Sequence, residues 1–239
     1  DAFYTSPREL FAALDKPEIR NAIILTLKSC TIAAILGVWV GLPLAYLLSR
    51  YKFPGRAIID TLVDIPVVLP PLVVGLSLLI LFNFTVLGRT VEQWCRTLFD
   101  TPVMFHVPAV ILSQFAVSTA FAVRTLRVAI EQIDPRAEDV ARTLGCSRAQ
   151  AFFHVCLPQL TSGIVAAFTV AWARSLGEFG PILVFAGSTR NKTEVLSTTV
   201  FLELSIGNLE AAVSVSLLMV LMAVLVLLAL RAWGARAKL

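Results

Sequence analysis

Five long stretches of this chain contain no charged residue. They are residues 29–49, 65–88, 101–123, 149–173 and 211–230. A helix needs about 20 residues to cross a hydrocarbon core about 30 Å thick. Backbone polar groups in lipid must be satisfied within the segment itself, so apolar runs of this length favour membrane-spanning helices. The sequence therefore predicts an all-α, polytopic membrane helical bundle with five visible spans.

The overall composition agrees with a membrane protein. Of the 239 residues, 57% are hydrophobic and only 15% are charged. The mean hydropathy is +0.82, which is too high for a soluble domain of this length. We expect one transmembrane domain over residues 1–239, surrounded by the lipid bilayer. The pI of about 9.1 is attributed to basic loops, and no nucleic-acid partner is expected.

The basic residues indicate the orientation of the chain. Lys and Arg concentrate in residues 49–57, in residues 124–148 and after Arg231. By the positive-inside rule these segments are cytoplasmic, which puts the C-terminus inside a cell membrane and the visible N-terminus outside. An outside start requires an upstream segment to translocate it, and the first 20 residues do not resemble a signal peptide. We therefore expect a sixth span before Asp1.

The second uncharged run is interrupted by prolines. Pro66, Pro70 and Pro71 predict a kink or an unwound turn, whose freed carbonyls face protein or water rather than lipid. We interpret these prolines either as part of a translocation path or as a packing kink. Asp60 and Asp64 come just before the run. They either mark a cytoplasmic exit that repels anions or favour the start of a helix.

The outer part of the fourth span carries two charges. Arg174 and Glu178 are four residues apart, so each can neutralise the other on one helix face. A charge within a span is costly and usually faces a bundle interior or a water-filled path. We interpret the pair as a lining or gate element, or else as a structural ion pair. The later apolar stretch 195–206 is too short to span, which predicts a re-entrant or interfacial helix.

The polar segment 134–158 divides into two short helices. Asp134, followed by a proline, is a favourable N-cap for the first helix. Gly145 is a typical C-terminal stop. Ser147 and Gln150 have the spacing of a capping box for the second helix.

This segment resembles the docking loop of ATP-binding-cassette (ABC) importer permeases. That loop carries Glu-Ala-Ala, then a Gly three residues on, then nine residues to an Ile-x-Leu-Pro end. Here Asp139-Val140-Ala141 corresponds to the start and Gly145 has the expected offset. Leu157-Pro158 closes the pattern. We call residues 134–158 the coupling segment.

Further stretches resemble the permeases of molybdate/tungstate importers, which are close relatives of sulfate/thiosulfate permeases. The resemblance extends from about residue 43 to residue 230, and the stretches that carry it are residues 53–55, 64–70, 141–145 and 172–180. It implies a type I ABC importer permease fold and a homodimer with one path at its interface. It also implies two cytoplasmic ATPase subunits, which hold ATP and Mg, and an extracytoplasmic oxyanion-binding protein. Sulfate permeases usually pair two different subunits, so homodimer and heterodimer both remain open.

The resemblance assigns ATPase docking to the coupling segment. Small side chains let a partner approach the backbone closely, and charges at the rim orient it. The assigned residues are Glu138, Asp139, Ala141, Arg142, Gly145, Leu157 and Pro158. The alternative is an amphipathic loop helix that lies on the lipid surface.

Enzyme chemistry finds little support in this sequence. The chain lacks a GxxxxGK[ST] phosphate loop, its two histidines are isolated, and its four cysteines form no metal-binding motif. We expect no cofactor or metal in this chain. The predicted function is translocation of an oxyanion, molybdate or tungstate before sulfate or thiosulfate, with selectivity mainly in the binding protein. The alternative from another class is a self-sufficient secondary transporter or channel.

Overall fold

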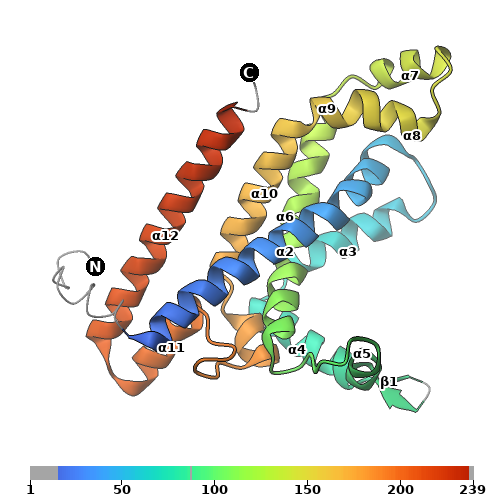
Figure 1. Ribbon diagram of the computed structural model, residues 1–239. Coiled ribbons are helices and arrows are strands. Elements are labelled where there is room, and N and C mark those ends of the chain that lie inside the picture. The colour runs from blue at the N-terminus through green and yellow to red at the C-terminus, as the bar shows by residue number, and fades with distance from the viewer. Residues whose placement is uncertain (1–15, 87, 237–239) are drawn as a thin grey trace.

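The computed structural model describes residues 16–86 and 88–236 and is almost entirely helical (Figure 1). Three of its helices are long and apolar enough to cross a membrane. They are α2 (Pro17–Arg50), α6 (Val107–Glu131) and α12 (Leu209–Arg236). Helices α2 and α12 contain the uncharged runs 29–49 and 211–230, and α6 contains residues 107–123 of the run 101–123. Three of the predicted spans are thus confirmed as single helices.

The other two predicted spans are each broken into two helical pieces. Helices α3 (Arg56–Val68) and α4 (Pro71–Asn83) meet at 116°. The helical stretch Arg148–Gln159 meets α10 (Thr161–Leu176) at 71°. Counted as one span each, the bent pairs give up to five spans. The prediction of five spans therefore agrees in number, but two of them are not straight.

Prolines explain the break between α3 and α4. Pro66 lies inside α3, Leu69 is extended (ψ 142°), and Pro71 is the first residue of α4. A proline cannot donate a backbone hydrogen bond, and the residue before it avoids the α conformation. The predicted irregularity is confirmed, and it is far larger than an ordinary kink.

A small β-hairpin departs from the all-α prediction. Strand β1 (Thr85–Val86) pairs with the antiparallel strand β2 (Arg89–Thr90). Helix α5 (Val91–Phe99) follows, and Thr90 caps it through a reciprocal capping box with Gln93.

The coupling segment forms the predicted pair of helices around a glycine turn. Helix α7 (Pro135–Thr143) begins at Asp134, whose side chain accepts a hydrogen bond from the Arg136 amide. Ser147 and Gln150 form the predicted capping box of the second helix. That helix runs in three pieces: α8 (Arg148–Ala151), the π-helix η1 (Phe152–Cys156) and α9 (Leu157–Gln159).

The chain after α10 contains two short helices. The π-helix η2 (Ile182–Ala186) is followed by α11 (Leu196–Ile206), which packs against α12 and α2. The predicted short apolar helix is thus present. Asn208 accepts a hydrogen bond from the Ala211 amide at the start of α12.

Helices α2, α6 and α10 pack together as the centre of the bundle (Figure 1). Two glycines of α2 bring it close to α6. A Cβ atom added to Gly37 or Gly41 would lie 3.3 Å from the side chains of Thr119 and Val123, respectively. Figure 1 shows α7, α8 and the end of α12 at one end of the bundle, with α11 and the start of α2 at the other.

Candidate functional site

The exposed face of the coupling segment is partly apolar. Leu144 is 81% exposed and Val140 is 58% exposed. An exposed ion pair lies on the same helix, with Arg142 Nη1 3.2 Å from Asp139 Oδ1. A bare apolar patch beside charges is typical of a protein interaction site. Val140 and Leu144 were not among the predicted docking residues, although two apolar side chains in a polar segment were a signal for them.

Gly145 forms the turn after α7. Its φ of +97° is left-handed, a conformation that favours glycine. The Cys146 amide donates to the Ala141 carbonyl and the Gly145 amide to the Arg142 carbonyl, both at 3.1 Å, which is the Schellman arrangement. The predicted stop is confirmed. Helix α7 ends at Thr143, so Gly145 lies in the turn and does not share a helical face with Ala141.

Glu138 does not lie at the exposed rim where we expected it. Its residue exposure is 7%. Its carboxylate accepts hydrogen bonds from Tyr46 Oη at 2.5 Å and from Arg50 Nε at 3.0 Å. These donors offset the cost of burying a carboxylate. Arg50 Nη2 also donates to the Ile133 carbonyl at 2.9 Å, so one side chain joins α2, the end of α6, and α7.

The Leu157-Pro158 end of the pattern lies where the segment turns into the bundle. Leu157 is half-buried and Pro158 is exposed. The preceding turn is a π-helix, in which the Leu157 amide donates to the Phe152 carbonyl. A wider turn accommodates the proline ring, which clashes with the carbonyl four residues earlier in an α-helix.

Asp60 and Asp64 are both paired with arginines of α6. Asp60 Oδ1 lies 2.6 Å from Arg127 Nη1, and Asp64 Oδ1 lies 2.7 Å from Arg124 Nε. Helix α3 begins at Arg56, so neither carboxylate is in its first turn. The interpretation as helix-start residues is therefore wrong. The arginines balance the two negative charges in the structure.

Arg174 and Glu178 form the predicted ion pair. Arg174 Nη1 lies 2.8 Å from Glu178 Oε1. Glu178 is 1% exposed, whereas the Arg174 side chain is 33% exposed and lies over the Phe121 ring at 5.4 Å. Helix α10 ends at Leu176, so the two residues do not share one helix as expected. Glu178 sits in the following turn.

The proline break and the turn after Glu178 lie against each other. A Cβ atom added to Gly180 would lie 3.2 Å from the Pro71 carbonyl carbon, and one added to Gly75 would lie 2.7 Å from Pro181 Cα. The structure thus brings Pro70 and Pro71 close to the segment that follows the Arg174 ion pair. The sequence did not predict this contact.

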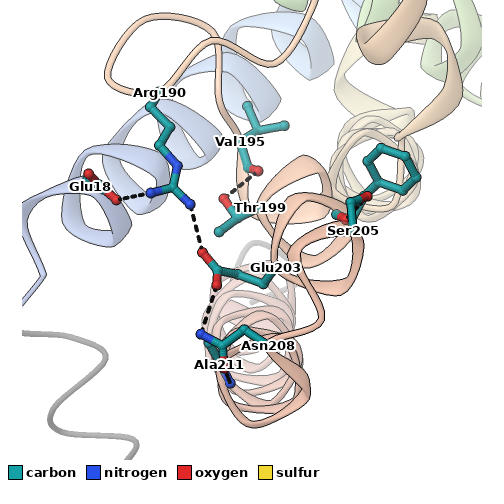
Figure 2. A network of polar contacts seen from close by, with 9 residues as sticks. Glu18, Arg190, Val195, Thr199, Glu203, Ser205, Asn208 and Ala211 are labelled. Carbon is teal, nitrogen blue, oxygen red and sulfur yellow. Dashed lines mark hydrogen bonds and ion pairs between the residues drawn. The ribbon is translucent and has the colours of Figure 1, made fainter.

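A polar network at the opposite end of the bundle was also missed (Figure 2). Arg190 donates to Glu18 at 2.9 Å and to Glu203 at 3.0 Å. The side-chain Nδ2 of Asn208 donates to Glu203 Oε2 at 3.1 Å. The network joins α2, the 187–195 loop, α11 and α12, and Arg190 is 172 positions from Glu18 in sequence.

Metal-binding clusters are absent from residues 16–86 and 88–236, where no group of three His, Cys, Asp or Glu side chains could hold an ion. All four cysteines are free thiols. His154 Nδ1 lies 2.8 Å from the Gln150 carbonyl within its own helix.

Curated relatives are transport permeases. The sulfate transport system permease protein CysT of Escherichia coli (strain K12) is 35% identical over 87% of this chain and 74% of its own length. The molybdenum transport system permease protein ModB of the same organism is 34% identical over 76% of this chain and 78% of its own length.

Solved structures share the fold. A bacterial alginate ABC transporter aligns with a TM-score of 0.75 at 20% identity, covering 98% of this chain and 84% of that one. The MetNI methionine ABC transporter aligns with a TM-score of 0.71 at 19% identity, covering 92% and 95%. The fold is therefore that of type I ABC importer permeases. The model of the family described as "Binding-protein-dependent transport system inner membrane component" matches residues 21–237, and this chain belongs to that family.

Proposed function

We propose that this chain is the membrane subunit of an ATP-driven importer for a tetrahedral oxyanion. Molybdate or tungstate is the first candidate substrate and sulfate the second. The support is the likeness to oxyanion permeases, because the sulfate permease CysT and the molybdenum permease ModB are 35% and 34% identical to this chain. These similar identities keep both substrates in the proposal.

The coupling segment carries the mechanistic part of the proposal. Val140, Leu144 and the Asp139–Arg142 ion pair are exposed to solvent, and we call these residues the exposed tip of the segment. The buried Glu138 fixes the inner face of the same helix to α2. A rigid element with an exposed apolar tip suits the docking of a cytoplasmic ATPase subunit that holds ATP and Mg. In this proposal Gly145 and Leu157-Pro158 determine the shape of the segment, and they contribute no charge to it.

The translocation path is proposed to pass the proline break and the Arg174–Glu178 pair. Glu178 offsets the positive charge of Arg174, so an anion meets no strong trap there and can leave. Asp60 and Asp64, paired with Arg127 and Arg124, stand at the proposed cytoplasmic exit. Selectivity is therefore assigned mainly to an extracytoplasmic binding protein.

The substrate and the assembly are linked in this proposal. A molybdate or tungstate importer implies two copies of this chain, with two ATPase subunits. A sulfate importer implies a second, different permease, since separate CysT and CysW sulfate permeases are both among the relatives. We also propose that the coupling segment and the end of α12 lie in the cytoplasm.

Two measurements test the proposal. Leu144→Asp is expected to abolish co-purification of the ATPase subunit, while His154→Ala, an exposed change on the same segment, retains it. Co-purification of the ATPase subunit with both variants would show that the exposed tip is not the docking surface. Calorimetry of the partner binding protein with molybdate, tungstate and sulfate in parallel identifies the substrate, and failure to bind any of the three would contradict oxyanion import.

A further inference from the structure

Helix α2 is fastened to the coupling segment by a buried joint. Glu138 of α7 accepts hydrogen bonds from Tyr46 and Arg50, which both lie in the last turns of α2. The Tyr46 ring also packs edge-on against Phe152 of η1, with the ring centroids 4.7 Å apart. Both helices of the coupling segment are thus held by the same end of α2.

The other end of α2 is fastened to the network in Figure 2. Glu18, in the first turn of α2, pairs with Arg190 of the 187–195 loop, and Arg190 also pairs with Glu203 of α11. Two turns further along α2, Thr26 Oγ1 accepts a hydrogen bond at 3.0 Å from the Leu196 amide, which begins α11. Movement of this end of α2 therefore displaces the loop and α11.

The length between the two joints is continuous helix. Helix α2 has 34 residues, and at about 1.5 Å per residue it extends about 50 Å, more than the hydrocarbon core. Pro43 interrupts one backbone hydrogen bond, but the helix is buried on both sides of it, at Gly41 and Ala45. Close packing on α6 keeps such a rod from bending freely.

We propose that α2 is the rod that carries movement of the coupling segment to the 187–195 loop and α11 on the outer face. Glu138 and Arg50 are positioning residues that act through α2. The inference rests on the proposed function, because it takes the coupling segment as the place where an ATPase acts. In this proposal Glu138 does not contact the ATPase directly, because its carboxylate is buried within the chain.

The hydrogen bonds of Glu138 and Arg50 fix the position of α7 relative to α2 more than they stabilise the fold. A buried ion pair is often no more stabilising than apolar side chains of similar volume, whereas its hydrogen bonds fix geometry. Arg50 holds the Glu138 carboxylate and the Ile133 carbonyl at once. A shift of α7 relative to the end of α6 therefore requires α2 to move or this bonding to break.

The test compares Glu138→Gln with Glu131→Gln in the reconstituted complex with ATPase and binding protein. Glu131 is an exposed glutamate on α6 that pairs with Arg127 of the same helix at 3.0 Å. Oxyanion uptake and ATP hydrolysis are measured on the same vesicles. We expect Glu138→Gln to lower uptake per ATP hydrolysed by about fivefold or more, the range of site-to-site coupling, with ATPase co-purification retained. Glu131→Gln keeps the wild-type ratio.

Two results overturn the inference. A wild-type uptake-to-hydrolysis ratio in Glu138→Gln shows that the joint transmits nothing. Loss of ATPase co-purification assigns Glu138 to docking instead. If Glu138→Gln does not assemble in the membrane, Tyr46→Phe is judged by the same ratio, since it removes one hydroxyl and keeps the Arg50–Glu138 pair.

A second readout does not depend on the substrate. Hydrogen exchange of residues 187–195 is followed in the complex before and after ATP with vanadate. The wild type is expected to change its exchange in this loop, and Glu138→Gln is expected to lose that change. If wild-type vesicles take up no oxyanion but hydrogen exchange in residues 187–195 still changes with ATP and vanadate, the proposed substrate is refuted. The role of α2 as a rod is not. An equal response in both proteins contradicts the rod.

Discussion

Gly180 packs directly on Pro71: a Cβ atom added to Gly180 would lie 3.2 Å from the Pro71 carbonyl carbon. Through this contact, the break between α3 and α4 packs against the turn that follows α10. Backbone atoms cannot give way as flexible side chains do. The close approach at Gly180 therefore leaves no room for a side chain between this turn and the start of α4.

Gly180→Val is expected to destabilise the bundle by about 1–3 kcal/mol, as overpacking does in cores. Its side chain must displace the start of α4. Thermal unfolding of the detergent-solubilised complex measures the loss. Gly177→Val is the matched control, because an added Cβ there would meet nothing closer than the Arg174 carbonyl at 3.8 Å. Equal stability of the two variants would contradict the packing described.

A substitution at Gly145 is expected to strain the backbone rather than to cause a steric clash. Its φ is +97°, and nothing lies within 4 Å of an added Cβ. Gly145→Val should destabilise this turn by about 1–2 kcal/mol and abolish ATPase co-purification while membrane insertion persists. Gly145→Asn should retain more complex, because asparagine tolerates the left-handed conformation. Complex and transport retained by the valine variant would refute the docking assignment.

Arg174→Met is expected to be strongly destabilising. It leaves the buried Glu178 carboxylate, which is 1% exposed, without its Arg174 partner. Removing one member of a buried pair typically costs about 3–5 kcal/mol, and the partial exposure of Arg174 puts this case at the lower end. The double variant Arg174→Met/Glu178→Met should recover much of the loss in thermal unfolding. A double variant less stable than Arg174→Met would show that the pair is not the relevant interaction.

Asp60→Asn and Asp64→Asn should behave differently from the buried pair. Their ion pairs with Arg127 and Arg124 are partly exposed, so each change should alter stability by less than about 1 kcal/mol. If these carboxylates line the exit, the double variant removes two negative charges and leaves Arg124 without Asp64, while Arg127 keeps its pair with Glu131. The added net positive charge should slow uptake of an anion, more at low salt than at high salt. Uptake rates over a salt series measure this. A double variant with the wild-type uptake rate at every salt concentration would contradict the exit role.

Local signals accounted for much of the fold. The caps at Asp134 and Ser147 and the stop at Gly145 depend on residues within one turn, so the sequence predicted them correctly. The prolines before α4 predicted an irregular span for the same reason. The 116° angle between α3 and α4 could not be predicted, and neither could the contact between the start of α4 and Gly180, which is distant in sequence.

Distant partners account for the main correction. Glu138 was expected at an exposed rim because the resemblance assigned it to ATPase docking. Its hydrogen-bond partners, Tyr46 and Arg50, are 92 and 88 positions away. Only the folded bundle brings them together. The pairing of Arg190 with Glu18 was missed for the same reason.

ATP-dependent uptake tests the central claim most directly. The chain is reconstituted in vesicles with its ATPase subunit and binding protein, and uptake of labelled molybdate, tungstate and sulfate is followed with and without ATP. We predict uptake of at least one oxyanion that requires ATP, the ATPase and an intact Leu144. Oxyanion uptake that persists without the ATPase or ATP would show a self-sufficient transporter or channel and contradict this account.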